Sequence, residues 1–299
     1  MQSLQYIKLR LRAVKNIGQI AKAMEVVAAT KMRKSQQIAL ATRPYAFKAL
    51  ELLEKMRRFA PLEVLPLTGF APFKKTLVVI IASDRGLAGA FNTQVFRYAE
   101  KFIEENCVFA TVGKKAEKFI IKKKLPLVGK FYGFGDFVAP KEVEPLTKFI
   151  IGGFKKGEWD RAITISMHFR TVLKQEPLVQ QILPVDFEKI RETVKAIVPE
   201  YGRYAELTQE TINNKQETNI DYLFEPSAKK ALEVLIPHLV EMQIYHLVLE
   251  ANASEHSARR VAMKNASENS EELFENFTLQ YNKARQSSIT NEMAERAYE

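Results

Sequence analysis

The sequence is poor in the residues that interrupt long regular elements. Its 299 residues include only 12 glycines and 12 prolines, below average usage for both. This scarcity argues against collagen-like chains, glycine-rich linkers and all-β folds with many turns. The apolar fraction of 46% excludes a disordered chain and is sufficient for one large or two small cores. Long helices are therefore expected.

Cysteine and histidine are also scarce. Cys107 is the only cysteine, which excludes an internal disulfide or a CxxC metal knuckle and fits a reducing compartment. His238, His246 and His256 lie along one helix, but no Asp, Glu or Cys completes a metal-ligand set at suitable spacing, so they are interpreted as seam or surface residues. His168 has no nucleophile motif beside it. We expect no metal site and no cofactor.

Long hydrophobic runs are absent. The richest run, Leu77 to Ala82, has six residues, whereas a membrane helix requires roughly 20. The segment from Ile7 to Ile20 is studded with basic residues and lacks the apolar core of a secretory signal. An Arg-rich amphipathic start can mimic a mitochondrial transit peptide, but this one continues unbroken into a much longer helix. We interpret it as mature structure, and we expect no membrane span.

The excess of 45 basic over 35 acidic residues is segregated along the chain. Residues 1–60 hold 13 basic and 3 acidic residues, a net charge of +10. Residues 228–299 hold 8 basic and 11 acidic residues, a net charge of −3. An antiparallel pairing would place these ends side by side, and although exposed ion pairs contribute only ~0–1 kcal/mol each, they would bias orientation and register.

The N-terminal segment has the periodicity of one long helix. Between Ser3 and about Arg58 the only breakers are Gly18 and Pro44, and Pro44 can bend or end the helix. About 55 residues would reach roughly 80 Å, which is too long for one globule to hide. The expected seam consists of Ile7, Leu11, Val14, Ile17, Ala21, Met24 and Ala28.

The C-terminal segment has a heptad pattern. The expected seam begins with Leu232, Leu235, Leu239, Met242, His246, Leu249 and Ala253. It continues more thinly through Ala258, Ala262, Ala266, Asn269, Leu273, Phe277, Gln280 and Ala284. A heptad is typical of a narrow helix–helix seam rather than of the broad face of a helix packed on a globular core. We therefore expect the two terminal helices to bury each other as a two-helix shaft.

Strands and helices alternate between these two ends. Strands are expected at Thr76–Ser83, Val108–Val112, Ala162–Met167 and Leu178–Leu183, and helices at Ala90–Asn106 and Lys114–Lys124. This alternation predicts a parallel sheet with helices on its faces. The fold class expected is α/β: an antiparallel coiled coil of long terminal helices with an inserted Rossmann-like domain. The expected divisions are 1–60 (helix), 61–75 (linker), 76–200 (α/β domain), 201–227 (connection) and 228–299 (helix).

The loop Asp84–Asn92 follows the first expected strand, at the edge where open α/β sheets bind ligands. One hypothesis is an α/β enzyme that binds a nucleotide or phosphate in this loop, although neither GxGxxG nor GxxxxGK[ST] is present. The alternative is a structural turn made by Gly86 and Gly89, with Asp84 paired to Arg85 or capping the next helix. Elsewhere in the domain, Trp159 is interpreted as an anchor under a Gly152–Gly153 turn.

The basic N-terminal helix raises a second alternative, nucleic-acid binding through phosphate contacts. Tyr6 is the only aromatic residue among its basic side chains, and no base-reading motif is visible. Solvation of an outer helix face, or an acidic protein partner, explains the charge more simply. We expect no nucleic-acid partner.

Four segments resemble the gamma subunit of F-type ATP synthases. They are LRAVKNIGQIAKAMEVVAATKMRK (11–34), SDRGLAGAFN (83–92), YLFEP (222–226) and ASEHSARRVAMKNASENSEELFENFTLQYNKARQSSITNE (253–292). The resemblance implies a non-catalytic central rotor stalk that couples ion-driven rotation of the c ring to ATP synthesis or hydrolysis. It implies alpha and beta subunits (three of each), epsilon and the c ring as partners. It places the chain at the cytoplasmic face of the bacterial inner membrane, with membrane contact only through the c ring.

The resemblance also implies partner-binding residues, and no catalytic ones. Contacts with the alpha/beta ring are expected at Met24, Glu255, Arg259, Arg285, Gln286 and Thr290, and contacts with epsilon and the c ring at Asp84, Arg85, Tyr222 and Glu225. From the residues alone, Met24 could equally be seam packing, Glu255 and Arg259 an i,i+4 helix pair, and Thr290 a surface hydroxyl.

Overall fold

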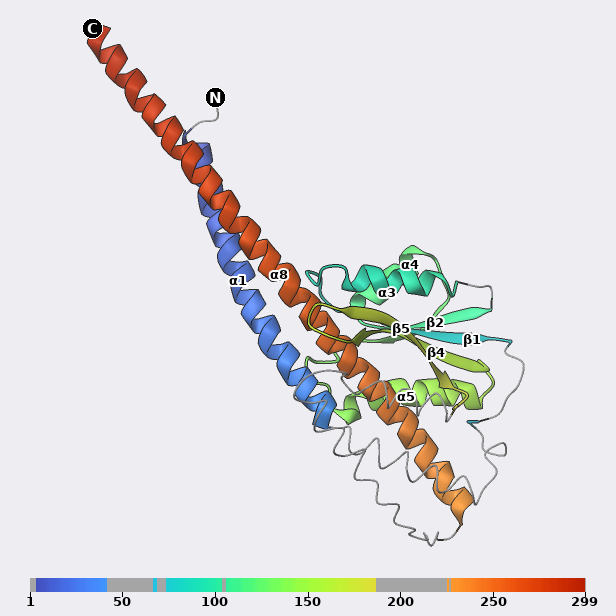
Figure 1. Cartoon of the computed structure of the whole chain (residues 1–299). Coiled ribbons are helices and arrows are strands. Elements are labelled where there is room, and N and C mark those ends of the chain that lie inside the picture. Colours follow the sequence, from blue (N-terminus) through green and yellow to red (C-terminus); the bar gives the residue numbers. More distant parts are fainter. Residues whose placement is uncertain are drawn as a thin grey trace.

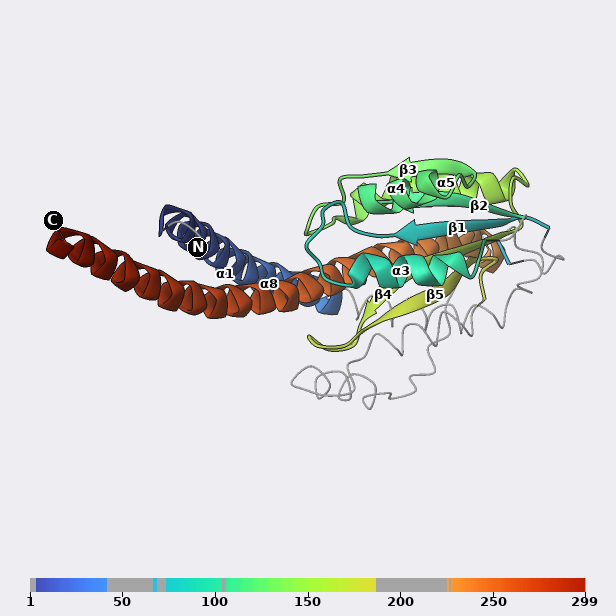
Figure 2. The ribbon, with the colours of Figure 1, turned by 90° about the horizontal axis from the view of Figure 1, so that it is seen from above.

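The structure, a computed structural model, describes residues 4–41, 67–68, 74–103, 106–186, 225 and 227–298. Two long helices, α1 (Leu4–Ala41) and α8 (Ala228–Tyr298), run antiparallel as a shaft that rises from an α/β domain (Figure 1). With 71 residues, α8 is roughly 105 Å long. Its first part lies beside the domain and its second part projects away from it (Figures 1 and 2). The expected fold class is confirmed. The segment 42–58 of the expected N-terminal helix lies outside the described residues.

The seam of α1 follows the expected spacing with one correction. Ile7, Ala21 and Ala28 are buried as expected, but Ile17 is 56% exposed and the neighbouring Gly18 faces α8. The apolar side chain at position 17 misled the prediction, because the seam here is set by how closely the backbones approach rather than by hydrophobicity.

The upper seam of α8 follows the expected one in part. Ala258, Ala262, Ala266, Phe277 and Ala284 are half-buried as expected, and the other buried or half-buried positions include Met263, Ser267, Ser270, Phe274 and Tyr281. Asn269, Leu273 and Gln280, which were expected in the seam, are exposed. The prediction extended the spacing of the first part of the helix to the second part. The first part packs on the α/β domain, whereas the second part pairs with α1.

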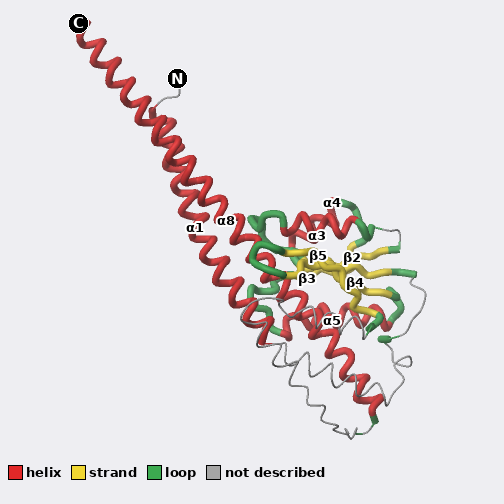
Figure 3. Tube along the Cα trace, viewed as in Figure 1, coloured by secondary structure: helices red, strands yellow, loops and turns green. Residues whose placement is uncertain are grey.

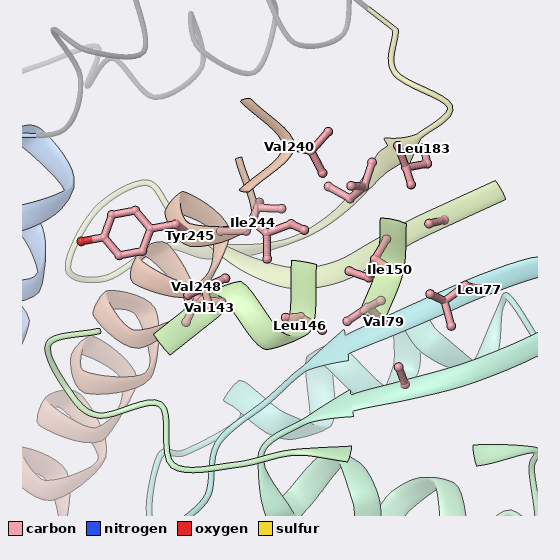
Figure 4. Packing of buried hydrophobic residues seen from close by; sticks show 14 of the residues in the cluster. Leu77, Val79, Val143, Leu146, Ile150, Leu183, Val240, Ile244, Tyr245 and Val248 are labelled. Carbon is pink, nitrogen blue, oxygen red and sulfur yellow. The ribbon is translucent and has the colours of Figure 1, made fainter. Parts of the chain in front are cut away.

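The first part of α8 is a core helix of the α/β domain. Leu232, Ile236, Val240, Ile244 and Val248 belong to one buried cluster with residues of the sheet and of α5 (Pro140–Lys155) (Figure 4). Every residue from Ile244 to Glu250 is buried, so the helix is enclosed on all sides there. The prediction that this stretch is a narrow seam against the other terminal helix was therefore wrong.

Among the described residues, one stretch, Lys229–Ala294 of α8, is long and apolar enough to cross a membrane by length and composition. Of its most apolar 18 residues, 56% are buried inside the structure. Since buried core helices can be equally long and apolar, the burial of α8 against the domain accounts for this composition.

The domain contains a five-stranded sheet in the order β3-β2-β1-β4-β5. Its strands are yellow in Figure 3. The strands are β1 (Thr76–Ile81), β2 (Cys107–Val112), β3 (Leu127–Phe131), β4 (Arg161–Phe169) and β5 (Gln175–Leu183). Four strands are parallel as expected, but β5 is antiparallel to β4. The short connection between β4 and β5 explains the difference, because a tight turn can join only antiparallel strands.

Helices cover both faces of the sheet. Because successive strand residues point to opposite faces, Val78 and Ile80 pack under α3 (Phe91–Glu100) and α4 (Lys114–Lys122), whereas Leu77 and Val79 pack under α5 and α8. Cys107 is buried, as expected for a small core residue.

Strand β3 and helix α5 were not expected from the sequence, and Gly152–Gly153, expected in a turn, lie inside α5. Trp159 is 2% exposed, which confirms its role as an anchor. Its indole lies on the helix backbone so closely that a β-carbon at Gly153 would be 2.1 Å from the ring. The Trp159 Nε1–H donates to the Ile150 carbonyl at 3.1 Å.

Candidate functional site

A cavity of about 560 Å³ lies where the shaft meets the α/β domain. It is lined by α1, α8, the loop after β1 and the loop after β3. Five of the ten expected partner-binding residues line it: Met24, Asp84, Arg85, Glu255 and Arg259. The structure thus brings together residues that the family resemblance divides between two groups of partners.

The loop after β1 is held by its own hydrogen bonds. The Ser83 backbone N–H donates to Asn92 Oδ1 at 3.1 Å, and the Asn92 Nδ2 donates to Ser83 Oγ at 2.8 Å. The Ser83 hydroxyl lies 2.6 Å from the Arg85 carbonyl, to which it donates. These bonds join the first and last residues of the loop, so its shape is fixed without a ligand.

Asp84 occupies a helix end. Its Oδ1 accepts a hydrogen bond from the backbone N–H of Lys114, the first residue of α4, at 3.0 Å. The carboxylate therefore lies where the partial positive charge of a helix N-terminus would attract a phosphate. This arrangement favours the structural interpretation of the loop, with Asp84 capping the second helix after it rather than the next one.

The tip of the loop projects and its base rests on α8. Leu87 has a φ of 64° and is 63% exposed, so a large apolar side chain in the left-handed region is presented at the cavity mouth. Gly89 has a φ of 54°, and a β-carbon there would lie 3.7 Å from the Ala262 side chain. Small residues on both sides therefore allow the loop to pack on the helix.

Arg259 connects α8 to this loop. It pairs with Glu255 one turn earlier, at 2.5 Å, and its Nη2 donates to the Gly86 carbonyl at 3.3 Å. Both side chains are largely buried, at 11% and 15% exposure. Burial raises the pKa of Glu255 against the opposing effect of the arginine. The pair is thus both an i,i+4 helix pair and a contact between the shaft and the domain.

Asp136, in the loop after β3, lies between the two shaft helices. Its carboxylate contacts Lys31 Nζ of α1 at 2.5 Å and His256 Nε2 of α8 at 2.9 Å. Burial alone would raise the pKa of Asp136, but the hydrogen bonds and charges of Lys31 and His256 together outweigh it, and the pKa is lowered. Burial, aided by the nearby Arg259 and Lys31 charges, lowers the pKa of His256 to about 4. None of these contacts was expected from the sequence.

A second buried polar group joins α8 to the sheet. The Glu250 carboxylate accepts hydrogen bonds from His168 Nδ1 of β4, at 2.6 Å, and from His246 Nε2, at 3.0 Å. Burial alone would raise the pKa of Glu250, but these two bonds outweigh it and bring the pKa to about 2. The i,i+4 spacing of His246 and Glu250 was the available sequence signal. In the described part of the chain, no group of three or more His, Cys, Asp or Glu side chains is arranged to hold a metal ion.

Three expected contact residues lie far from the cavity. Arg285, Gln286 and Thr290 are exposed on α8, about 26 residues and roughly 40 Å beyond Arg259. The Thr290 hydroxyl donates to the Gln286 carbonyl within the helix, at 2.9 Å. They follow Ala284, the last half-buried residue of the seam, so this end of α8 extends past α1 (Figure 1).

The remaining two expected residues precede α8 in the sequence. Glu225 is exposed, three residues before the helix begins. Tyr222 lies outside the described residues, as does most of the expected connection 201–227.

Comparison with known proteins identifies relatives along the whole chain. The family model described as ATP synthase matches residues 3–295. The ATP synthase gamma chain of Roseiflexus castenholzii is 36% identical over 99% of this chain and 96% of its own length. The ATP synthase gamma chain of Chloroflexus aurantiacus is 35% identical over 99% of this chain and 97% of its own.

Solved structures support the fold. A chain in the Euglena gracilis mitochondrial ATP synthase, in a structure of OSCP, F1 and the c-ring, has a TM-score of 0.65 at 19% identity, covering 98% of this chain and 92% of that one. A chain in the central stalk and c-ring structure of the Tetrahymena thermophila mitochondrial ATP synthase has a TM-score of 0.57 at 21% identity. The match covers 83% of this chain and 99% of that one. From its matched family model and its relatives over nearly their full length, this chain belongs to the gamma subunit family of ATP synthases, the central stalk of the F-type enzyme.

Proposed function

We propose that this chain couples ion-driven rotation of a c ring to ATP synthesis or hydrolysis at a ring of alpha and beta subunits. The observation that carries the proposal is the shape of α8: one continuous helix is a core element of the α/β domain at one end and extends past α1 at the other. A torque applied to the domain is therefore carried along the shaft without a joint in the chain.

The surface of the upper shaft suits rotation inside a sleeve. Beyond Ala284, the described side chains of α8 are exposed and mostly polar or charged. Such a surface can contact successive neighbours without the large dry interface that would hold it in one position. Arg285, Gln286 and Thr290 are proposed to contact the alpha/beta ring here. Differential contact with each of three catalytic sites would shift their conformational equilibria in turn.

The cavity at the base of the shaft is proposed as a second contact region. Met24, Glu255 and Arg259 would meet the alpha/beta ring near it, and Asp84 and Arg85 would lie toward epsilon and the c ring, together with Tyr222 and Glu225. In this assignment the chain itself performs no chemistry and needs no cofactor. The complex would lie at the cytoplasmic face of a bacterial inner membrane, with the chain attached through the c ring. The division into the five segments given above is part of this proposal.

Reconstitution tests the function. The purified chain is mixed with alpha and beta subunits of a close relative, and ATP hydrolysis is measured with and without it. We expect the complete mixture to hydrolyse ATP and the chain alone to be inactive. If intact alpha and beta subunits gain no activity from the chain, the rotor assignment is wrong. Turnover of ATP by the isolated chain would instead support an enzyme that uses the Asp84–Asn92 loop.

A further inference from the structure

The two helices of the shaft are attached to the α/β domain in different ways. Helix α8 contributes apolar side chains to the domain core from Leu232 to Ala251. It is also tied to the end of β4, where the Ser254 hydroxyl donates to the Met167 carbonyl at 3.3 Å. Helix α1 pairs extensively with α8 but has few close contacts with the described strands and the other described helices. Ile38 and Ala39 of α1 also pack against the core cluster that includes α8 and the sheet. The other contacts of α1 with the described part of the domain are polar.

Those contacts converge on Asp136. Lys31 and Ser35 lie one turn apart on the same face of α1. Lys31 Nζ contacts the Asp136 carboxylate at 2.5 Å, and the fully buried Ser35 hydroxyl donates to the Asp136 carbonyl at 3.1 Å. Beside them, Lys34 Nζ lies 4.2 Å from the centre of the Phe137 ring. One short segment of the loop thus contacts three polar side chains from one face of α1.

The same aspartate is bonded to α8. His256 Nε2 lies 2.9 Å from its second carboxylate oxygen, and the other ring nitrogen, Nδ1, lies 3.3 Å from Arg259 Nη1. Because arginine can only donate, Nδ1 accepts and Nε2 carries the proton that is given to Asp136. Arg259 Nη2 in turn donates to the Gly86 carbonyl. A continuous series of hydrogen bonds therefore runs from the loop after β1, through α8 and Asp136, to Lys31 of α1.

We propose that Asp136 is a positioning residue that locks α1 to the α/β domain, so that both shaft helices turn with the domain as one unit. A torque transmitted through α8 alone would reach α1 only through the seam between the two helices, which includes small residues such as Gly18, Ala21 and Ala28. Around such a seam α1 could rotate relative to the domain. The Asp136 contacts with Lys31 and Ser35 lie to one side of the α8 axis, so they oppose rotation of α1 about α8. This inference rests on the rotor function proposed above.

The first test uses hydrogen exchange in the full-length chain alone. Asp136→Asn removes the charge and keeps the shape. We expect the amides of residues 28–38 to exchange about tenfold faster, because a charged tie has been lost, and those of residues 244–251 to be unchanged. The control is Glu117→Gln, which removes the exposed Lys130–Glu117 pair inside the domain and should leave α1 unchanged. Identical exchange of α1 in the Asp136 variant and the wild type overturns the inference.

A second variant keeps the test decisive if Asp136→Asn unfolds the chain. Lys31→Gln changes a side chain that is 34% exposed and, within the described residues, forms its ion pair with Asp136, so the fold should persist. It should accelerate exchange over the same residues of α1. Unaltered exchange in Lys31→Gln overturns the inference whatever the first variant does.

The second test uses the assembled, membrane-bound complex. We expect the Asp136→Asn complex to keep most of its ATP hydrolysis but to move at least about twofold fewer ions per ATP, because coupling through the tie is weakened. Asp136→Glu, which retains a carboxylate, should recover most of the ratio. A normal ratio in Asp136→Asn overturns the role of this residue and leaves the rotor function standing. Failure of the wild-type chain to activate the alpha and beta subunits would instead contradict the rotor function.

Discussion

Gly18 of α1 and Ser270 of α8 lie in such close contact that a β-carbon built on the glycine would be 3.2 Å from the serine β-carbon. About two turns further along, the Arg10 guanidinium lies 5.7 Å from the centre of the Phe277 ring, which continues the same antiparallel register. The helices therefore approach most tightly where neither side chain is large. This contact explains why the seam passes through position 18 rather than Ile17.

Gly18→Leu should destabilise the shaft. The added side chain has no space beside Ser270, and overpacking of this kind costs roughly 1–3 kcal/mol. Urea unfolding followed by circular dichroism measures the loss. Ser270→Ala is the control, because it keeps the β-carbon and removes only the hydroxyl bond to the Ala266 carbonyl; it should change stability by less than about 0.5 kcal/mol. Equal stability of Gly18→Leu and the wild type would show that the helices can separate freely here.

Gly153→Ala should disrupt the packing of Trp159. The new β-carbon would be 2.1 Å from the indole, so the ring must leave its position, at a cost of roughly 3 kcal/mol. Fluorescence reports this directly, since Trp159 is the only tryptophan. Gly152→Ala, one residue earlier in α5, meets nothing within 4 Å and should be neutral or stabilising by up to about 1 kcal/mol. An unchanged emission spectrum in Gly153→Ala would contradict the described contact.

Glu250→Gln should remove a pH-dependent contribution to stability. The pKa of Glu250 is about 2 in the folded chain against 4.5 when unperturbed, so the unfolded state binds more protons between these values. The stabilisation is complete above pH 4.5, on the order of 3 kcal/mol, and is lost as the pH falls toward 2. The difference in unfolding free energy between the variant and the wild type should therefore shrink across this window. Glu144→Gln, which removes an exposed pair with Lys148, is the control.

His256→Gln should weaken the pH dependence of the unfolding free energy between pH 6.5 and 4. The pKa of His256 falls from 6.5 to about 4 on folding, so protons bind preferentially to the unfolded chain between pH 6.5 and 4. The unfolding free energy of the wild type should decrease as the pH is lowered through this window, and that of the variant should decrease less. Denaturant titrations at half-unit pH intervals give both slopes. Parallel slopes would mean that His256 is not held neutral in the folded state.

Truncation after Arg285 should weaken torque more than assembly. The removed residues lie beyond the last half-buried seam position, so the melting temperature of the chain should change by less than about 2 °C. Under the rotor proposal, the lost contacts include Gln286 and Thr290, and torque measured on single reconstituted complexes should fall by about half. Equal loss of assembly and torque would contradict this division of roles.

Periodicity was sufficient to predict the elements that are regular and long. The two terminal helices, four of the five strands and the buried Trp159 followed from spacing, β-branched runs and composition. It failed for β3, whose five residues, Leu127–Phe131, are a short half-exposed edge strand with a central glycine. It also failed for α5, because Pro145 and the Gly152–Gly153 pair resemble helix breakers although packing tolerates them.

The polar contacts could not be predicted in the same way. Asp136 is 105 residues from Lys31 and 120 from His256, so their meeting depends on the tertiary fold and leaves no local pattern. The whole seam of α8 could not be assigned for a related reason. A heptad pattern specifies that a helix has a partner, but not which partner, and along α8 the partner changes from the sheet to α1.

The enclosed stretch from Ile244 to Glu250 has a consequence for biosynthesis. Together with α5 it covers one face of a sheet whose strands are encoded between residues 76 and 183, so part of that face stays uncovered on the ribosome until residues 244–250 have been translated. A nascent domain with an open apolar face is prone to aggregation during that interval. The sheet can therefore complete its core only when the long C-terminal helix has been synthesised. A chain that ends before residue 244 would leave an aggregation-prone fragment rather than an independently folded domain.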